Sequence, residues 1–100
     1  MIIESYNTTD GITFVVSGRI TFADHKNMRE LVRAVERRDY PKVVFDLEKI
    51  EFIDSSAIGM LLLVRETAVA HGVEVAIKGA RGRIARLMSV ARFDQLFAMV

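Results

Sequence analysis

The feature that most constrains the fold is a short apolar run, VVFDL, at residues 43–47. Asp46 is its only polar residue, so the run lacks the apolar–polar alternation typical of a strand with one solvent-exposed face. Such a run is typical of a parallel strand buried on both faces. Parallel strands need long crossover connections, which are usually helical, so this segment predicts an α/β domain.

Before this run the sequence predicts a β-hairpin. Two β-rich segments, residues 2–6 and 12–17, are separated by a polar stretch that ends in Asp10-Gly11. Asp-Gly between such segments is a hairpin signal, because glycine tolerates the positive φ of a tight turn. Gly18 is expected to end the second strand.

Three segments are expected to form helices. The first follows Thr21, the expected N-cap with Asp24 completing a capping box, and stops before Pro41. The second spans residues 55–71 and ends on Gly72, a favourable C-terminal residue. Apolar residues recur at i, i+3, i+4 and i+7 in the other two: Met28, Leu31, Val32 and Val35 in the first, and Ile84, Leu87, Met88 and Ala91 in the third.

Two further strands complete the expected order, one at residues 73–77 and a short one at 96–100. The sequence therefore predicts one α/β domain over residues 1–100, with the order β-β-α-β-α-β-α-β. Alternating strands and helices favour right-handed crossovers and a mostly parallel sheet of four to five strands with packed helices. Whether the helices cover one face of the sheet or both stays open at this point.

Composition limits the chemistry of the chain. It has 100 residues, a net charge of +1 and no cysteine, which excludes disulfides, thiolate zinc sites and cysteine nucleophiles. The only histidines, His25 and His71, lie at the ends of different helices, and no G-x-S-x-G or P-loop pattern is present. We therefore expect no enzyme activity, catalytic residue, metal or cofactor. The N-terminus lacks a signal-peptide pattern and the longest apolar stretch is short, so we expect a cytoplasmic protein without membrane association.

The segment with the clearest functional pattern is residues 46–54, which holds four acids and one lysine. It leads into a helix through Asp54-Ser55-Ser56, and either of the first two residues could cap that helix. Ser55 could instead accept a phosphate, because free N–H groups and the helix dipole favour an anion there. A phosphate would add about −1.5 to −2 charges and oppose an apolar partner contact.

The sequence FIDSSAIGML at residues 52–61, together with VVFDL, resembles the signature of STAS domains, and more narrowly of bacterial anti-sigma factor antagonists. The resemblance covers nearly the whole chain. In that family the serine after the aspartate is phosphorylated, which corresponds to Ser55. The resemblance implies a partner switch: the unphosphorylated form binds a serine-kinase anti-sigma factor, phosphorylation releases it, and a PP2C-type phosphatase restores binding. The G-R-x-x-F-x-x-H stretch at residues 18–25 is similar to shorter members, whose partners include a response-regulator-linked phosphatase and kinase.

The second helix has more apolar positions than one buried stripe needs. Ile58, Leu62 and Leu63 are the least accounted for, and we expect them to form an exposed binding surface near Ser55. Together with the resemblance, this gives an expected partner-binding set of Asp54, Ser56, Ala57, Ile58, Leu62, Leu63, Thr21 and His25.

A basic run is the remaining feature; it comprises Lys78, Arg81, Arg83, Arg86 and Arg92, with no acid between them. It could be a solvated helix face, a contact for an acidic protein, or a site for RNA or acidic lipid headgroups. No aromatic residue is interleaved for base stacking, so nucleic-acid binding is an alternative that we do not expect. A further alternative keeps the fold and makes the chain a STAS subunit of a transport or stress-sensing assembly.

Overall fold

Five strands form one sheet in the order β1-β2-β3-β4-β5 in the computed structural model, which describes residues 1–100. β1 pairs antiparallel with β2, and the remaining pairs are parallel. The strands are β1 Ile2–Thr8, β2 Gly11–Ile20, β3 Lys42–Ile53, β4 Glu74–Lys78 and β5 Ala98–Met99. The helices are a 3-10 turn η1 at Phe22–Asp24, α1 His25–Glu36, α2 Ser55–His71, α3 Gly82–Val90 and α4 Phe93–Leu96. The predicted α/β class with a mostly parallel sheet is confirmed.

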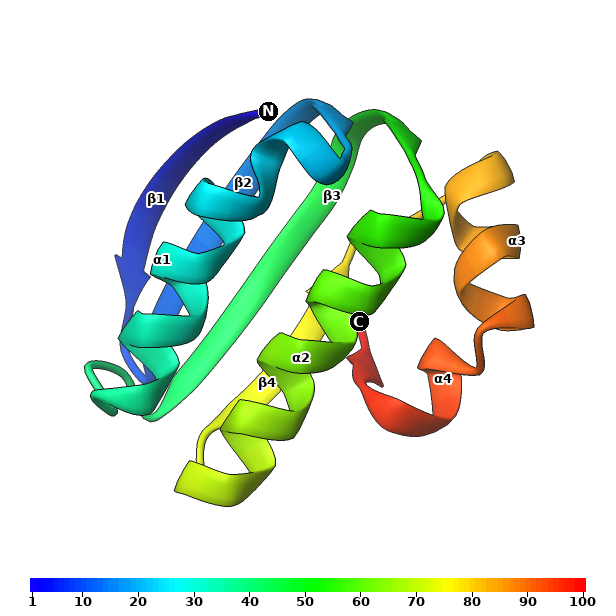
Figure 1. Cartoon of the computed structure of the whole chain (residues 1–100). Coiled ribbons are helices and arrows are strands. Elements are labelled where there is room, and N and C mark those ends of the chain that lie inside the picture. Colours follow the sequence, from blue (N-terminus) through cyan, green and yellow to red (C-terminus); the bar gives the residue numbers. More distant parts are fainter.

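All helices lie on one face of the sheet (Figure 1). Each new parallel strand is added on the same side of the previous one, and right-handed crossovers then place every connection on the same face. This decides the question that the sequence left open. The core of 23 buried residues lies between the two layers, and the predicted stripe of α1 is buried within it: Met28, Leu31, Val32 and Val35.

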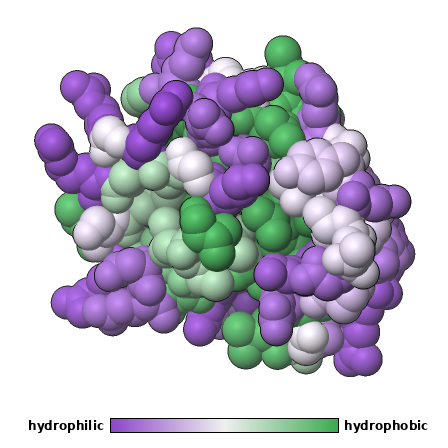
Figure 2. All heavy atoms as spheres, turned by 180° about the vertical axis from the view of Figure 1, so that it is seen from behind, coloured by the Kyte–Doolittle hydropathy of each residue, from purple (hydrophilic) through white to green (hydrophobic).

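The other face of the sheet carries no helix, so the expectation that residues 43–47 are buried on both faces is wrong. Phe45 and Leu47 point toward the helices and are buried, whereas Val44 and Asp46 are only half-buried. Figure 2 shows this open face, with apolar side chains near its centre and hydrophilic ones around them. Valine is common in strands of either kind, so a second valine in the run did not require a second buried face.

β3 is longer than the run predicted at residues 43–47, and the acidic stretch that leads into α2 forms its second half. Buried side chains recur there at Leu47, Ile50 and Ile53, every third residue, because the pairing with β2 shifts register twice. Such shifts hide the two-residue period by which a strand is recognised. Gly18, with φ of +84°, lies at one of them, so it does not end β2, which continues to Ile20.

The C-terminal region also differs from the prediction. The last strand is only Ala98–Met99 rather than residues 96–100, and it follows the short α4, which was not predicted. The buried rings of Phe93 and Phe97, 4.8 Å apart between centroids, hold this segment against the core. Leu87 is 40% exposed, so its assignment to the buried stripe of the third helix is wrong, because a nine-residue helix at the end of the layer has a narrow covered face.

Candidate functional site

The candidate site lies at the edge of the sheet where the parallel strands end. The β2–α1, β3–α2 and β4–α3 connections all begin there (Figure 1). In α/β proteins ligands and partners are commonly bound outside the carboxyl ends of parallel strands. Ser55 is the first residue of α2 at this edge, and it is exposed.

Asp54 is the N-cap of α2 and joins two of these connections. Its Oδ1 accepts a hydrogen bond of 2.8 Å from the N–H of Ala57, and its Oδ2 accepts one of 3.1 Å from the N–H of Phe22. Its own N–H donates to the carbonyl oxygen of Ile20, 3.2 Å away. Because Asp54 provides the cap, the hydroxyl of Ser55 is left free of that role.

The β2–α1 connection is held in a defined shape beside Ser55. The N–H of Thr21 donates to Asp24 Oδ2 over 2.9 Å, as the predicted capping box requires, and the helix begins with the η1 turn. The ring of Phe22 stacks on that of His25, with centroids 5.1 Å apart, and His25 Nδ1 lies 3.0 Å from the carbonyl oxygen of Phe22. The side chains of Thr21 and His25 are half-buried.

Phe22 is the residue that sequence reasoning missed. It is 66% exposed, which is unusual for an aromatic residue in a chain with few of them. Its only signals were its place after Thr21 and its position in the G-R-x-x-F-x-x-H stretch, and neither distinguishes an exposed ring from a core ring. The fold decides its exposure, because the hydrogen bond to Asp54 fixes its backbone at the rim of the molecule.

The apolar candidates on α2 lie on two different sides of that helix. Leu63, 54% exposed, lines a groove of about 130 Å³ between α1 and α2, whose other lining residues are His25, Met28, Arg29, Val32 and Met60. Ile58 and Leu62 are half-buried and pack on the core, on the side of α2 that also carries Arg65 and faces α4. The structure therefore brings Leu63 together with His25 and separates both from Ile58 and Leu62.

Two further candidates differ in accessibility. Ser56 is half-buried in the first turn of α2. Ala57 has no exposed surface, so the prediction that its side chain contacts a partner is wrong. The reason is helical geometry: Ala57 falls on the same stripe as Leu61 and Val64, which faces the sheet.

Comparison with known proteins gives the family of this chain. Residues 3–100 match the STAS domain family. The chain belongs to that family. A STAS-domain containing protein of Pseudomonas aeruginosa (strain UCBPP-PA14) is 31% identical over 101 residues, covering 97% of each chain.

Solved structures show the same STAS fold at low identity. A putative anti-sigma factor antagonist of Thermotoga maritima superposes with a TM-score of 0.87 at 15% identity, covering 97% of this chain and 84% of that one. The anti-sigma factor antagonist SpoIIAA in its unphosphorylated form has a TM-score of 0.79 at 15% identity, covering 99% and 87%. SpoIIAA of Bacillus in its phosphorylated form has a TM-score of 0.78 at 12% identity, covering 99% and 91%.

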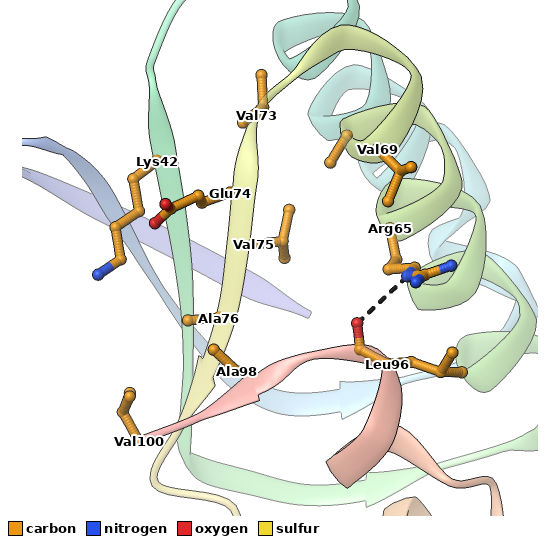
Figure 3. A pocket seen from close by; sticks show the side chains of 11 residues that line it. Lys42, Arg65, Val69, Val73, Glu74, Val75, Ala76, Leu96, Ala98 and Val100 are labelled. Atoms are coloured by element: carbon orange, nitrogen blue, oxygen red, sulfur yellow. Dashed lines mark hydrogen bonds between the residues drawn. The ribbon is translucent and has the colours of Figure 1, made fainter.

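A second cavity of this STAS domain lies away from Ser55. It measures about 270 Å³, lies beside the first residues of β4, which β5 does not pair with, and reaches the C-terminal half of α2 (Figure 3). Arg65 lines this cavity, and its guanidinium donates hydrogen bonds to the carbonyl oxygen of Leu96, 3.2 Å away, and to the carboxylate of Glu66, 2.9 Å away. No cluster of three or more His, Cys, Asp or Glu side chains is arranged to hold a metal ion. None of the helices has the length and apolar character needed to span a bilayer.

Proposed function

We propose that this STAS domain is an anti-sigma factor antagonist that acts as a phosphorylation-controlled partner switch, with Ser55 as the phosphoacceptor. The observation that carries the proposal is the position of Ser55: exposed, first in α2, and relieved of capping by Asp54. Membership of the STAS family and a fold shared with SpoIIAA, which has been solved with and without phosphate, support it.

In the unphosphorylated state the domain binds a serine-kinase anti-sigma factor. The contact surface consists of five residues of the predicted set, with Phe22 as the one addition. The five are Thr21, His25, Asp54, Ser56 and Leu63. The exposure of Phe22 and Leu63 supports this assignment, because exposed large apolar groups beside polar ones are typical of reversible interfaces.

Phosphorylation ends this contact. The kinase transfers the γ-phosphoryl group of ATP to Ser55 Oγ, which loses its proton, and ADP leaves. The phosphate is well placed at the N-terminus of a 17-residue helix, so the domain stays folded. The partner, however, would have to desolvate a group of about −1.5 to −2 charges. That costs several kcal/mol, comparable with the roughly 8 kcal/mol of a micromolar complex.

A PP2C-type phosphatase, in one form linked to a response regulator, hydrolyses the phosphoserine and restores binding. In this proposal the kinase and the phosphatase are separate cytoplasmic chains, and this domain supplies only the substrate serine and the docking surface. Nucleic acid and membrane take no part in the switch.

The test compares tagged Ser55→Ala, Ser55→Asp and Thr9→Asp variants as baits in native lysate, with mass spectrometry of the bound proteins. Thr9 lies exposed in the β1–β2 turn, at the opposite edge of the sheet, so Thr9→Asp controls for the added charge. Ser55→Ala and Thr9→Asp should retain an ATP-binding kinase, and Ser55→Asp should lose it. The retained kinase with ATP should place one phosphate on Ser55 of the wild-type chain. Equal recovery by all three baits, or phosphate on Ser56 alone, contradicts the assignment.

A further inference from the structure

The third helix carries two stripes of side chains. Ile84 and Met88 are buried against the core. Arg83, Arg86, Leu87 and Val90 recur at i, i+3, i+4 and i+7 on the solvent side, with Leu87 40% and Val90 81% exposed. Together with Arg81 at the start of the helix, these four residues form what we call the α3 surface.

The arginines of this surface are almost free of ion pairs. Arg83 and Arg86 take part in no salt bridge, and Arg81 reaches only Glu48, at 4.0 Å between two mostly exposed side chains. A pair of that kind contributes little. By contrast, Arg33 and Arg37 of the α1 region each pair with an acid at 2.7 and 3.1 Å.

The arrangement is locally unfavourable for folding. Arg81 occupies the N-cap position of α3 but provides no side-chain cap, and the first turn holds Arg83 and no acid. The partial positive charge of a helix N-terminus disfavours cations there. Arg92, just beyond the helix, has φ of +63°, where glycine would be less strained. Departures from local rules that gather in one patch are typical of functional surfaces.

The α3 surface begins at the same edge of the sheet as Ser55. β3 and β4 are parallel neighbours, so the connections that follow them lie side by side (Figure 1). The turn before α3 packs closely on β3: a Cβ placed on Gly79 would lie 3.0 Å from the Cβ of Glu48. A protein that covers Ser55 therefore needs to extend its contact surface only slightly to reach the start of α3.

Resting on the proposed function, we propose that the kinase partner carries an acidic segment that docks on the α3 surface. Its carboxylates face Arg81, Arg83 and Arg86, and an apolar side chain contacts Leu87 and Val90. Charge complementarity of this kind mainly accelerates association, and the apolar pair slows dissociation.

Two other classes of occupant fit less well. Membrane-surface helices present a broad apolar face with Trp, Phe or Leu, whereas this stripe offers two aliphatic side chains on a nine-residue helix. Single-stranded nucleic acid is bound through aromatic stacking, and the α3 surface has no aromatic residue. An acidic protein segment uses both the arginines and the aliphatic pair.

The experiment measures association of the captured, purified kinase with an Arg83→Glu/Arg86→Glu variant. An Arg33→Glu/Arg37→Glu variant makes the same charge change on the α1 side. In 50 mM NaCl the α3 variant should associate at least tenfold more slowly than wild type, and the control less than twofold. In 300 mM NaCl the difference should narrow because salt screens the attraction. Acids near the start of α3 suit the helix dipole, so the α3 variant should keep its melting temperature.

A cross-linker placed at Val90 should label an acidic segment of the kinase. Glu→Lys or Asp→Lys changes in that segment should restore association with the α3 variant.

If Ser55→Asp releases the kinase while the α3 variant associates normally, the proposed function stands and the acidic contact is overturned. If the α3 variant alone loses the partner and Ser55→Asp does not, the phosphoserine switch is overturned instead. Failure of every bait to retain a kinase overturns both. Retention on phosphatidylglycerol vesicles or poly(U), lost in the α3 variant, replaces the protein segment with lipid or RNA and overturns the inference.

Discussion

The two long helices of this domain use their apolar residues differently. In α1 the large apolar residues are confined to one side of the helix: all four are buried against the sheet, and charged side chains occupy the outer side. α2 also buries four, but two of its large apolar side chains, Leu63 and Val69, are more than half exposed. The apolar residues of α1 are therefore accounted for by the fold, whereas α2 has a surplus. We propose that this surplus, on the helix that begins with Ser55, serves partner binding.

The largest expected change in stability distinguishes the buried apolar residues of α2 from the exposed ones. Leu61→Ala removes a side chain that is 1% exposed and should lower the free energy of unfolding by about 2–5 kcal/mol. Leu63→Ala removes an equal side chain from the groove and should change stability by less than about 0.5 kcal/mol. Urea denaturation measures both. Leu63→Ala should nevertheless weaken the kinase complex about tenfold, as truncation of a central interface residue does. Equal loss of stability in both variants would mean that Leu63 belongs to the core and not to an interface.

A smaller loss of stability is expected when Asp54 is replaced, because this residue caps α2 and accepts a hydrogen bond from the turn that precedes α1. Asp54→Ala removes the acceptor for the N–H groups of Ala57 and Phe22 and should destabilise the domain by about 1–2 kcal/mol. Asp54→Asn keeps one side-chain oxygen and should lose less than half of that. Amide NMR shifts of Phe22 should move in both variants. An unchanged Phe22 signal would show that Asp54 does not join the two connections in solution.

The smallest effects concern the ends of the helices. α2 ends on Gly72 at φ of +71°, and α1 is followed by Arg38 at φ of +56°. Gly72→Ala should destabilise the domain by about 1 kcal/mol and Arg38→Gly should stabilise it by about 0.5–1 kcal/mol, both measured by thermal unfolding. Gly59→Ala is the matched control, since a Cβ there meets no atom within 4 Å in ordinary helical backbone. It should stabilise α2 by about 1 kcal/mol. The same sign for Gly72→Ala and Gly59→Ala would contradict the positive φ at the end of α2.

The sequence predicted the elements of the fold better than their limits. The periodic stripe in α1 and the β1–β2 hairpin depend on neighbours a few residues apart, so they are visible in the chain itself. The expected positive φ at Gly11 is wrong: this glycine is the first residue of β2, pairs with Thr8, and leaves room for the backbone of Lys42. The second half of β3 was missed because its spacing of buried residues depends on shifted pairing with β2. α4 was missed because it is one turn long, and its stability comes from burial of Phe93 and not from local preference.

For the candidate site, the sequence by itself determined the residue types: an aspartate followed by a serine at the start of a helix, and an arginine run without acids. Those features follow from residue type and order. The sequence left open whether Asp54 or Ser55 caps the helix, and the structure assigns the cap to Asp54. The tertiary structure decided accessibility and grouping. It exposed Phe22 and Leu63, buried Ala57, separated Ile58 and Leu62 from His25, and placed the start of α3 beside the start of α2. Accessibility depends on what packs against each side chain from distant parts of the chain, which local patterns do not contain.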